Sequence, residues 1–331
     1  MLKVLQNEFA VLYEKQRLKI EDKISRVLIN RKPESLYEPC SYIMQSGGKR
    51  LRPLLVLFSA RACGGEFKNA YNAAAAVELL HNFTLVHDDI MDNADKRRGR
   101  VTTHKKYDLS TAILTGDNLL AVAYLTLLKD CRENDKSVLA TFTQGVIEVC
   151  EGQSLDKDFE VRKNVSLAEY LEMINKKTAA LLEVCCSVGA QIGGGSKDKI
   201  KALSLFGRNL GIAFQLQDDL LDITAKEAEF GKIIGGDLVE GKKTFLFIRA
   251  LEKARGKDKT KLLEVIKNKG IQKSQVGEYR DIYHRLGVLE ETEGEIARYT
   301  RLALKSLKAV EDEKARGALE WLANSLINRN K

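Results

Sequence analysis

The chain has 331 residues, of which 44% are hydrophobic and 30% charged, a composition that supports a packed core and excludes disorder, collagen and small disulfide-bonded scaffolds. Its three prolines all lie near the start and only 7% of its residues are aromatic, so an all-β fold with a turn every few residues is not expected. The formal net charge of +8 permits a nucleic acid, an anionic membrane surface or a phosphorylated small molecule as partner and does not choose between them.

Several features of the sequence predict the compartment. The six cysteines show no C-x-x-C spacing, which indicates reduced, mostly buried thiols. The first residues mix acidic, basic and apolar side chains, unlike a signal or transit peptide. No run reaches the roughly 18 apolar residues that a membrane span needs. We therefore expect a soluble, cytoplasmic protein without a membrane span.

Apolar residues recur at three- and four-residue steps through most of the chain, which predicts an all-α fold. No linker or internal repeat divides the sequence, so we expect one domain over residues 1–331, a large bundle of ten or more helices. The expected helices cover residues 1–30, a short segment that ends at 46–48, and then 53–63, 68–92, 108–130, 136–152, 167–190, 198–222, 242–254, 257–268, 274–286 and 288–327.

The helix expected over 68–92 is apolar on nearly every face and ends in a cluster of acids. Asp88 and Asp92 stand four residues apart and point the same way, whereas Asp89 is turned by about 100°. Two like charges so placed repel each other unless a cation lies between them, and carboxylate oxygens completed by water and phosphate are what Mg²⁺ prefers. On its own this pattern also suits a solvated acidic helix end.

A second copy of the pattern changes this balance. Another apolar helical segment runs into Asp218-Asp219-Leu220-Leu221-Asp222, with Asp218 and Asp222 again four residues apart. Two such clusters predict several Mg²⁺ ions around one highly charged anion, as metal-assisted phosphate chemistry requires.

Basic residues accompany glycines near both clusters. Lysine and arginine on glycine-rich turns commonly bind phosphate oxygens, although each set alone also suits a solvated surface. Together with the acids they indicate a site for two diphosphates, above apolar helix walls that suit a hydrophobic tail on the substrate. The sets are Gly47–Pro53, Lys96–Arg100 and, on glycine-flanked segments after the second cluster, Lys232, Lys242 and Lys243.

The combination of motifs resembles the E-type (trans) isoprenyl diphosphate synthases, and most closely an archaeal-type geranylgeranyl diphosphate synthase. The resemblance implies an all-helical homodimer with a central substrate cavity, which joins isopentenyl diphosphate head-to-tail to dimethylallyl, geranyl or farnesyl diphosphate with Mg²⁺. The motifs fall in the family's order and are GGKRLRP at 47–53, LLHNFTLVHDDIMD at 79–92, RRG at 97–99, EGQSLD at 151–156, KTA at 177–179, FQLQDDLLD at 214–222 and GK…GGD…EGKKT from 231 to 244.

The resemblance also implies a role for single residues. Asp88, Asp92 and Asp218 would bind the Mg²⁺ ions that hold the allylic diphosphate. Asp89, Asp219 and Asp222 would support these metal ligands, and Thr178 and Gln215 would line the reacting centre and stabilise an allylic cation. The allylic diphosphate would contact Arg97, Lys177, Lys232 and Lys242, and the diphosphate of isopentenyl diphosphate would contact Lys49, Arg52, His81 and Arg98. Ile233 replaces a proline that usually follows the residue at Lys232.

Residues upstream of the first cluster set the product length in this family. Phe83 lies five residues before Asp88, about 7.5 Å back along the helix, and its neighbour Thr84 is small. One aromatic there resembles the geranylgeranyl synthases, with Leu80 and Val77 deeper and no tighter stop. Phe83 as an ordinary core residue is the alternative.

Four other classes of protein share part of this pattern. A farnesyl or longer-chain synthase would share the same chemistry. A terpene cyclase normally has an N-D-x-x-S-x-x-x-E motif, which this sequence lacks. A non-catalytic prenyl synthase subunit generally loses one aspartate cluster, and both are present here. A nucleic-acid binder would not need two acidic clusters, which repel phosphate without metal.

Overall fold

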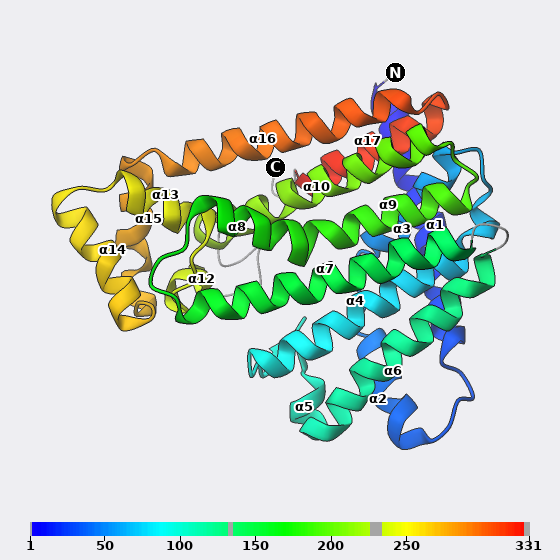
Figure 1. Ribbon diagram of the computed structural model, residues 1–331, viewed down its shortest axis with the longest axis horizontal. Helices are drawn as coiled ribbons and strands as arrows, with labels where there is room; N and C mark the ends of the chain where they lie inside the picture. Colours follow the sequence, from blue (N-terminus) through cyan, green and yellow to red (C-terminus); the bar gives the residue numbers. More distant parts are fainter. Residues whose placement is uncertain (1, 132–134, 226–233, 328–331) are drawn as a thin grey trace. The chain divides into compact units, whose positions relative to one another are not determined.

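The computed structural model describes residues 2–131, 135–225 and 234–327, and it is almost entirely helical (Figure 1). The chain forms two compact units. The first is made of residues 1–146, 184–204 and 307–322, and the second of residues 147–183, 205–306 and 323–331. The all-α prediction is confirmed, whereas the prediction of a single domain stays a prediction.

The helices divide between the units as follows. The first unit holds α1 (Leu2–Val27), α2 (Glu34–Met44), α3 (Leu51–Ala62), η1 (Phe67–Asn69), α4 (Tyr71–Met91), α5 (Thr103–Lys106), α6 (Leu109–Leu127), η2 (Leu128–Asp130) and η5 (Leu307–Ala309). The second unit holds α8 (Leu167–Ile174), the π-helical turn η3 (Asn175–Ala179), α12 (Gly236–Val239), α13 (Phe245–Lys253), α14 (Gly256–Asn268), η4 (Lys273–Gln275), α15 (Val276–Arg285) and α16 (Val288–Ser306). Both units share α7 (Asp135–Val161), α9 (Ala180–Ile192), α10 (Lys197–Thr224) and α17 (Glu313–Ile327).

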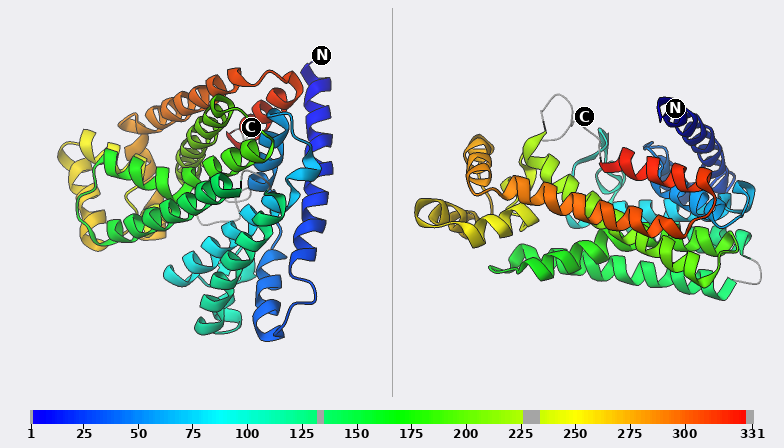
Figure 2. Two further views of the ribbon diagram at one scale, coloured as in Figure 1. Left: turned by 45° about the vertical axis from the view of Figure 1, so that its right-hand side comes forward. Right: turned by 90° about the horizontal axis from the view of Figure 1, so that it is seen from above.

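Helix α4 forms the centre of the first unit. Its first turns carry the fully buried run Ala73–Ala76, whose small side chains allow other helices to pack closely. Helix α6 runs alongside α4 (Figures 1 and 2). Near its end, α4 lies against Gly116, where an added Cβ would come 2.6 Å from His87 Nε2. The close pairing of these helices therefore depends on a glycine.

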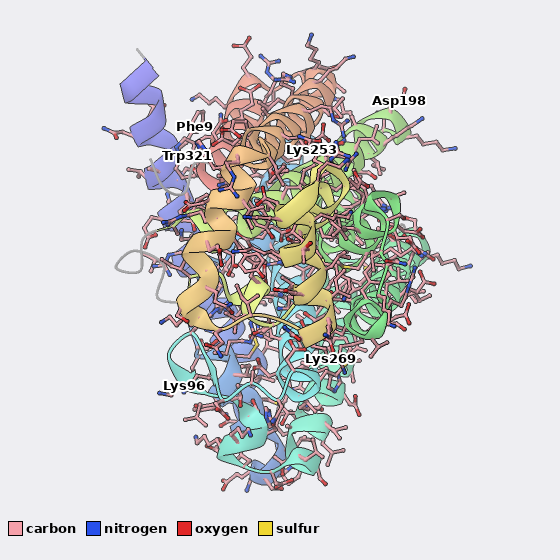
Figure 3. The ribbon with its side chains drawn as sticks, turned by 90° about the vertical axis from the view of Figure 1, so that its left-hand side faces the viewer. Phe9, Lys96, Asp198, Lys253, Lys269 and Trp321 are labelled. Carbon is pink, nitrogen blue, oxygen red and sulfur yellow. The ribbon has the colours of Figure 1, made fainter. Side chains whose placement is uncertain are left out.

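The two ends of the chain's first unit pack together through α1 and α17. The ring of Phe9 fills the space over Gly317, and Tyr13 packs edge-on against Trp321 with ring centroids 5.5 Å apart. Figure 3 labels Phe9 and Trp321 on these neighbouring helices. Trp321 therefore belongs to the packing of the unit.

A short β-hairpin follows α4 and contains Lys96, which Figure 3 labels. Strands β1 (Lys96–Arg97) and β2 (Arg100–Val101) pair antiparallel, and both turn residues, Arg98 and Gly99, have positive φ. This is the left-handed geometry that favours two-residue hairpin turns. Tyr42 of α2 anchors the hairpin, because its hydroxyl donates to the Val101 carbonyl at 2.8 Å and its ring lies 4.0 Å from the Arg100 guanidinium.

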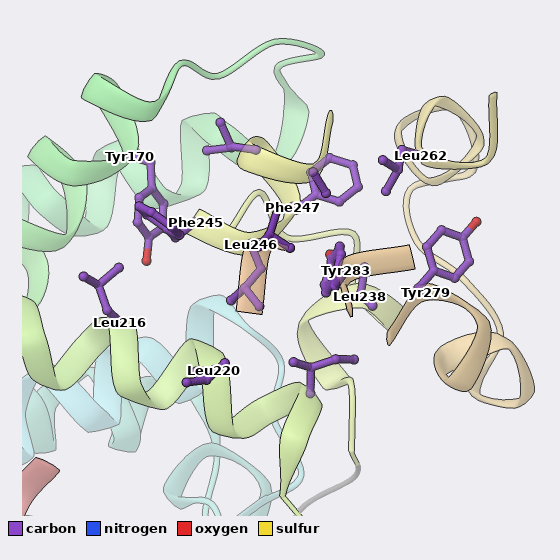
Figure 4. Close-up of a cluster of buried hydrophobic side chains, with 14 of the residues drawn as sticks. Tyr170, Leu216, Leu220, Leu238, Phe245, Leu246, Phe247, Leu262, Tyr279 and Tyr283 are labelled. Atoms are coloured by element: carbon purple, nitrogen blue, oxygen red, sulfur yellow. The ribbon is translucent and has the colours of Figure 1, made fainter. Parts of the chain in front are cut away.

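The second unit has its own core, shown in Figure 4. The start of α13 buries Phe245, Leu246 and Phe247 in succession, and α10 contributes Leu216 and Leu220. Most of the remaining core side chains are aliphatic or aromatic residues of α8 and α14–α16. This core supports the last turns of α10, where the second aspartate cluster stands.

A π-helical turn interrupts the helix that the sequence predicts over 167–190. Two glycines allow neighbouring helices to approach this turn. A Cβ on Gly152 of α7 would lie 2.2 Å from the backbone nitrogen of Lys177, and a Cβ on Gly211 of α10 would lie 2.4 Å from the Ala179 Cα. Such π turns occur often at functional sites, and this one carries Lys177 and Thr178.

Several element boundaries differ from the predictions. The helix expected over 288–327 is two helices, because Asp312 accepts the Ala315 backbone N–H at 3.0 Å and caps α17. Helix α2 ends at Met44 and contains Pro39, and α7 continues to Val161 instead of ending at residue 152. Only three of the six cysteines, Cys40, Cys185 and Cys186, are fully buried.

The expectation that no segment is apolar enough to cross a membrane is wrong for one helical stretch. By length and composition alone, Leu109–Asp130 could cross one, and it is the single such stretch in the described part of the chain. In the most apolar window of that stretch, 44% is buried inside the protein. One such helix is weak evidence for a membrane span.

Candidate functional site

The first aspartate cluster stands at the carboxyl end of α4. Asp88 is half-buried and Asp92, the C-cap, is exposed. Asp89 is only 1% exposed, and its Oδ1 accepts a hydrogen bond from Arg97 Nε at 2.6 Å. Burial raises the pKa of Asp89, although the Arg97 charge opposes this shift. The hairpin thus folds back so that an arginine neutralises the buried middle acid.

The glycine-rich turn before α3 lies beside the hairpin. Arg98 donates to the Gly47 carbonyl, and its guanidinium lies so close to Gly48 that an added Cβ there would come 3.0 Å from Nη1. Lys49 is exposed at this turn. The structure therefore brings Lys49 and Arg98, two of the predicted diphosphate ligands, to one turn.

The other two predicted ligands, Arg52 and His81, contact each other. Arg52 Nη1 lies 3.2 Å from His81 Nε2. Burial and then the positive charges of Arg52, Arg98, Arg97 and Arg50 lower the pKa of His81 well below its usual value. The imidazole is therefore neutral at pH 7 and accepts from Arg52, which makes Arg52 the cationic member of the pair.

Arg50 holds this turn in place, a role that the sequence did not single out. It is 3% exposed, and its guanidinium binds Glu78 Oε1 at 2.6 Å, Glu21 Oε1 at 2.9 Å and the Met44 carbonyl at 2.9 Å. Its φ of 49° places it in the left-handed region at the start of α3. Three helices thus fix the backbone between Lys49 and Arg52.

The residues predicted to limit product length lie on α4. Val77 and Leu80 are fully buried, and Phe83 is 9% exposed. The Phe83 ring packs edge-on against His87 with centroids 4.9 Å apart, and the Thr84 hydroxyl donates to the His81 carbonyl at 2.8 Å. Thr84 therefore directs its polar group back to its own helix.

The second aspartate cluster stands near the end of α10. Asp219 is 6% exposed, and both of its oxygens are hydrogen-bonded: Oδ2 accepts from the Tyr170 hydroxyl and Oδ1 from Gln215 Nε2 at 2.9 Å. Gln215 Oε1 in turn accepts from the Thr178 hydroxyl at 2.8 Å. Burial and then the Asp237 charge raise the pKa of Asp219 to about 8.

Asp222 completes this acidic group with Asp237. The Asp237 backbone N–H donates to Asp222 Oδ2 at 3.1 Å. Burial and then the Asp237 charge raise the pKa of Asp222 to about 6. Lys242 lies 3.6 Å from Asp237 Oδ1 and 2.8 Å from Glu240 Oε2. The acids of the second unit are therefore crowded, and a cation would relieve their repulsion.

A cavity of about 140 Å³ opens within the second unit, and six of its lining residues carry its chemistry. Lys177, held by Asp156, and Lys242 supply positive charge. The polar line of Thr178, Gln215 and Asp219 forms another part of the wall. The structure thus brings together five residues that the sequence placed at the reaction.

The donors fit Mg²⁺ as the ion that the sequence implies. Among the described side chains no three His, Cys, Asp or Glu groups form a ready-made metal cage. Each helix end instead offers oxygen ligands that water and substrate phosphates would complete, as is usual for Mg²⁺. The buried Asp89 Oδ2 has no hydrogen-bond partner within the described ranges, which is the kind of acceptor that a hydrated cation satisfies.

Some residues of these sites could not be predicted from the sequence, and one predicted residue lies outside the part of the chain that the structure describes. Tyr170, Asp156 and Asp237 line the cavity of the second unit, and of these only Asp156 and Asp237 fell within a quoted motif. Tyr170 had no signal in the sequence, because its partner Asp219 is 49 residues away. Lys232 lies outside the described residues.

Comparison with known proteins gives the family. The geranylgeranyl diphosphate synthase of Sulfolobus acidocaldarius is 42% identical over 302 residues, 89% of this chain and 91% of that protein. The short chain isoprenyl diphosphate synthase of Methanothermobacter thermautotrophicus is 38% identical over 93% of this chain and 95% of its own length. Among solved structures, the geranylgeranyl pyrophosphate synthetase of Pyrococcus horikoshii Ot3 superposes with a TM-score of 0.91 at 39% identity, covering 97% of this chain and 98% of the other.

A sequence profile described as polyprenyl synthetase matches residues 33–285, which span the glycine-rich turn, both aspartate clusters and the cavity of the second unit. These matches cover most of the chain at well above 30% identity. The chain therefore belongs to the polyprenyl synthetase family and is a prenyltransferase.

Proposed function

We propose that the enzyme condenses isopentenyl diphosphate head-to-tail with an allylic diphosphate and that its main product is geranylgeranyl diphosphate. The observation that carries this proposal is the cavity of the second unit, where two lysines and a hydroxyl–amide line lead to the second aspartate cluster. Cations suit the leaving diphosphate and neutral oxygens suit an allylic cation.

The proposed chemistry needs no nucleophile or strong base from the protein. Mg²⁺, when bound by Asp88, Asp92 and Asp218, would neutralise the diphosphate charge. Arg97, Lys177, Lys232 and Lys242 would bind the same diphosphate and orient its leaving oxygen.

Ionisation of the C–O bond would place an allylic cation beside Thr178 and Gln215. The double bond of isopentenyl diphosphate would attack this cation, and the departing diphosphate would take the proton that is then lost. Apolar walls protect the cation from water.

The first unit offers a separate set for the diphosphate of isopentenyl diphosphate. Lys49, Arg52 and Arg98 supply the charge. We propose that His81, being neutral, orients Arg52 through their 3.2 Å contact. Asp89, Asp219 and Asp222 would support the metal-binding acids.

The proposed product length rests on Phe83. Its ring is packed against His87, which itself abuts α6 at Gly116, so the ring has little room to turn aside. Phe83→Ala is expected to lengthen the product beyond twenty carbons, because the next side chains down the helix, Leu80 and Val77, are smaller stops. Chromatography of labelled products by chain length measures this, and an unchanged distribution would show that Phe83 is ordinary core.

We also propose that the two units form one domain and that the protein is a cytoplasmic homodimer. Helix α6 supports the dimer, because it exposes Ile113, Leu114 and Leu125 by 41%, 58% and 57%. Apolar exposure of this kind suits a second copy of the chain. The mass of the protein in solution without detergent tests this proposal.

The decisive experiment is an assay of radiolabelled isopentenyl diphosphate with dimethylallyl, geranyl and farnesyl diphosphates, with and without Mg²⁺. A Mg²⁺-dependent twenty-carbon product is expected. A fifteen-carbon product or one longer than twenty carbons would keep the reaction and reject the length. No condensation with any acceptor would instead indicate a non-catalytic subunit.

A further inference from the structure

The Tyr170 hydroxyl donates a hydrogen bond to a carboxylate of the reaction cavity. It is among the largest fully buried side chains, 2% exposed, in the core of the second unit. Figure 4 shows its hydroxyl pointing toward the stretch of α10 that carries Leu216 and Leu220. Between these two leucines stands Asp219, whose Oδ2 accepts the Tyr170 hydroxyl proton. The ring belongs to the core, whereas the hydroxyl belongs to the cavity wall.

This contact fixes the direction of the hydrogen bonds beyond Asp219. A carboxamide has donors at one end and an acceptor at the other. Because Gln215 Nε2 donates to Asp219 Oδ1 at 2.9 Å, its Oε1 must face Thr178, and the Thr178 hydroxyl donates to it at 2.8 Å. The Thr178 hydroxyl thus donates its proton to Gln215, and the lone pairs of the Thr178 oxygen remain available to the cavity.

The opposite arrangement would disfavour the reaction. If the Gln215 amide were turned over, its N–H would face Thr178, and the Thr178 hydroxyl would be free to direct its proton into the cavity. The positive end of an O–H dipole would then meet an allylic cation. The direction of the line, and not only its presence, therefore matters for the chemistry.

We propose that Tyr170 is a positioning residue for the condensation: it holds Asp219 so that Gln215 and Thr178 present oxygen lone pairs to the allylic cation. The inference rests on the proposed function, since it assigns a role within the same cavity. Tyr170 touches neither substrate nor diphosphate in this role and acts through Asp219.

The test is the variant Tyr170→Phe, which keeps the ring and removes only the hydroxyl. We expect kcat to fall about tenfold. The KM for isopentenyl diphosphate should stay within about twofold, because the diphosphate ligands of that substrate are untouched. The matched control is Tyr279→Phe, another buried tyrosine of the same core, whose hydroxyl donates to the Lys261 carbonyl at 3.1 Å. That variant should keep the wild-type kcat.

A double-mutant cycle with Gln215→Leu separates positioning from a purely structural role. If Tyr170 acts through Gln215, Tyr170→Phe lowers kcat no further once Gln215 has lost its amide. Losses that multiply in the double variant, or a wild-type kcat for Tyr170→Phe, would overturn the inference.

A second variant covers a failure of Tyr170→Phe to fold. Asp219→Leu, similar in shape, removes the acceptor that fixes the Gln215 amide. At saturating Mg²⁺, where support of the metal-binding acids does not limit the rate, it should lower kcat in the wild-type background and not beside Gln215→Leu; multiplying losses would again overturn the inference. Failure of the wild-type enzyme to condense any substrate pair would overturn the proposed function itself. An active wild type with an unaffected Tyr170→Phe would overturn only the role of Tyr170.

Discussion

The two aspartate-rich helix ends share one sequence pattern and treat its middle residue differently. At the end of α4, the buried Asp89 is held by the charged guanidinium of Arg97 at 2.6 Å. Near the end of α10, the buried Asp219 is held by two neutral donors, the Tyr170 hydroxyl and the Gln215 amide. One cluster therefore offsets a buried negative charge with a cation, and the other surrounds a carboxyl group with dipoles.

The outer and middle acids of the D-D-x-x-D pattern are therefore positioned in different ways. Helical spacing alone places Asp88 with Asp92, and Asp218 with Asp222, on one side of their helices. The middle acid points elsewhere, so its partner depends on what the fold packs there. Burial raises the pKa of Asp89 against the opposing charge of Arg97, whereas burial and then the charge of Asp237 act together to raise the pKa of Asp219 to about 8.

The largest expected effect tests whether the two aspartate clusters both bind the metal ions. Asp88→Ala and Asp218→Ala should each lower kcat/KM by roughly a thousandfold, since each removes a proposed ligand of the ions that neutralise the leaving diphosphate. Steady-state assays over a Mg²⁺ titration would measure this. The control is Asp95→Ala, whose side chain is 84% exposed at the base of the hairpin. A small effect at only one of the two clusters would show that this cluster does not bind the ions that neutralise the diphosphate.

A smaller effect tests the difference between the middle acids. Asp89→Asn should lower the free energy of unfolding by about 1–2 kcal/mol, because Arg97 loses a charged hydrogen-bond partner and its side chain is itself 31% exposed. Asp219→Asn should lower it by about 0.5 kcal/mol or less at pH 7, because a carboxyl group with a pKa of about 8 is mostly neutral there.

Urea unfolding of the metal-free variants at pH 7 measures both changes. Equal losses would mean that the two middle acids are held by interactions of the same strength. A larger loss for Asp219→Asn would reverse the comparison.

The sequence predicted the parts of the site that helix geometry determines. The apolar runs before Asp88 and Asp218 are long and periodic, so both helices and the spacing of their outer acids followed directly. Their motifs assign Lys177, Thr178, Gln215 and Asp219 to the reaction, and all four line one cavity of the structure.

The remainder depends on contacts between distant segments. The π turn at Lys177 and Thr178 follows from the close approach of α7 at Gly152 and of α10 at Gly211, which no local propensity encodes. The pairing of Tyr170 with Asp219 needs the tertiary fold. The break between α16 and α17 was missed because apolar residues continue through it, and Val310 in the break is itself buried.

His81 in the first unit and the acids Asp219 and Asp222 in the second should respond to pH with opposite sign. In the second unit, Asp219 and Asp222 have raised pKa values of about 8 and about 6, so the native state binds more protons than the unfolded state and loses stability as pH rises through this range. In the first unit the pKa of His81 is lowered, so between that value and about 6.5 the unfolded state binds more protons. Its contribution to stability is therefore lost as pH falls.

His81→Gln isolates the contribution of the histidine, because glutamine still offers Arg52 an acceptor but does not titrate. Between pH 7.5 and pH 5.5 the wild type should lose about 1.4 kcal/mol relative to this variant, the cost of leaving one histidine unprotonated one unit below its usual pKa. Urea unfolding of metal-free protein at the two pH values measures it, with His284→Gln, an exposed histidine, as the control that should follow the wild type. If both variants follow the wild type, the native state does not lower the pKa of His81, and the buried setting beside Arg52 on which the orienting role of His81 rests would be wrong.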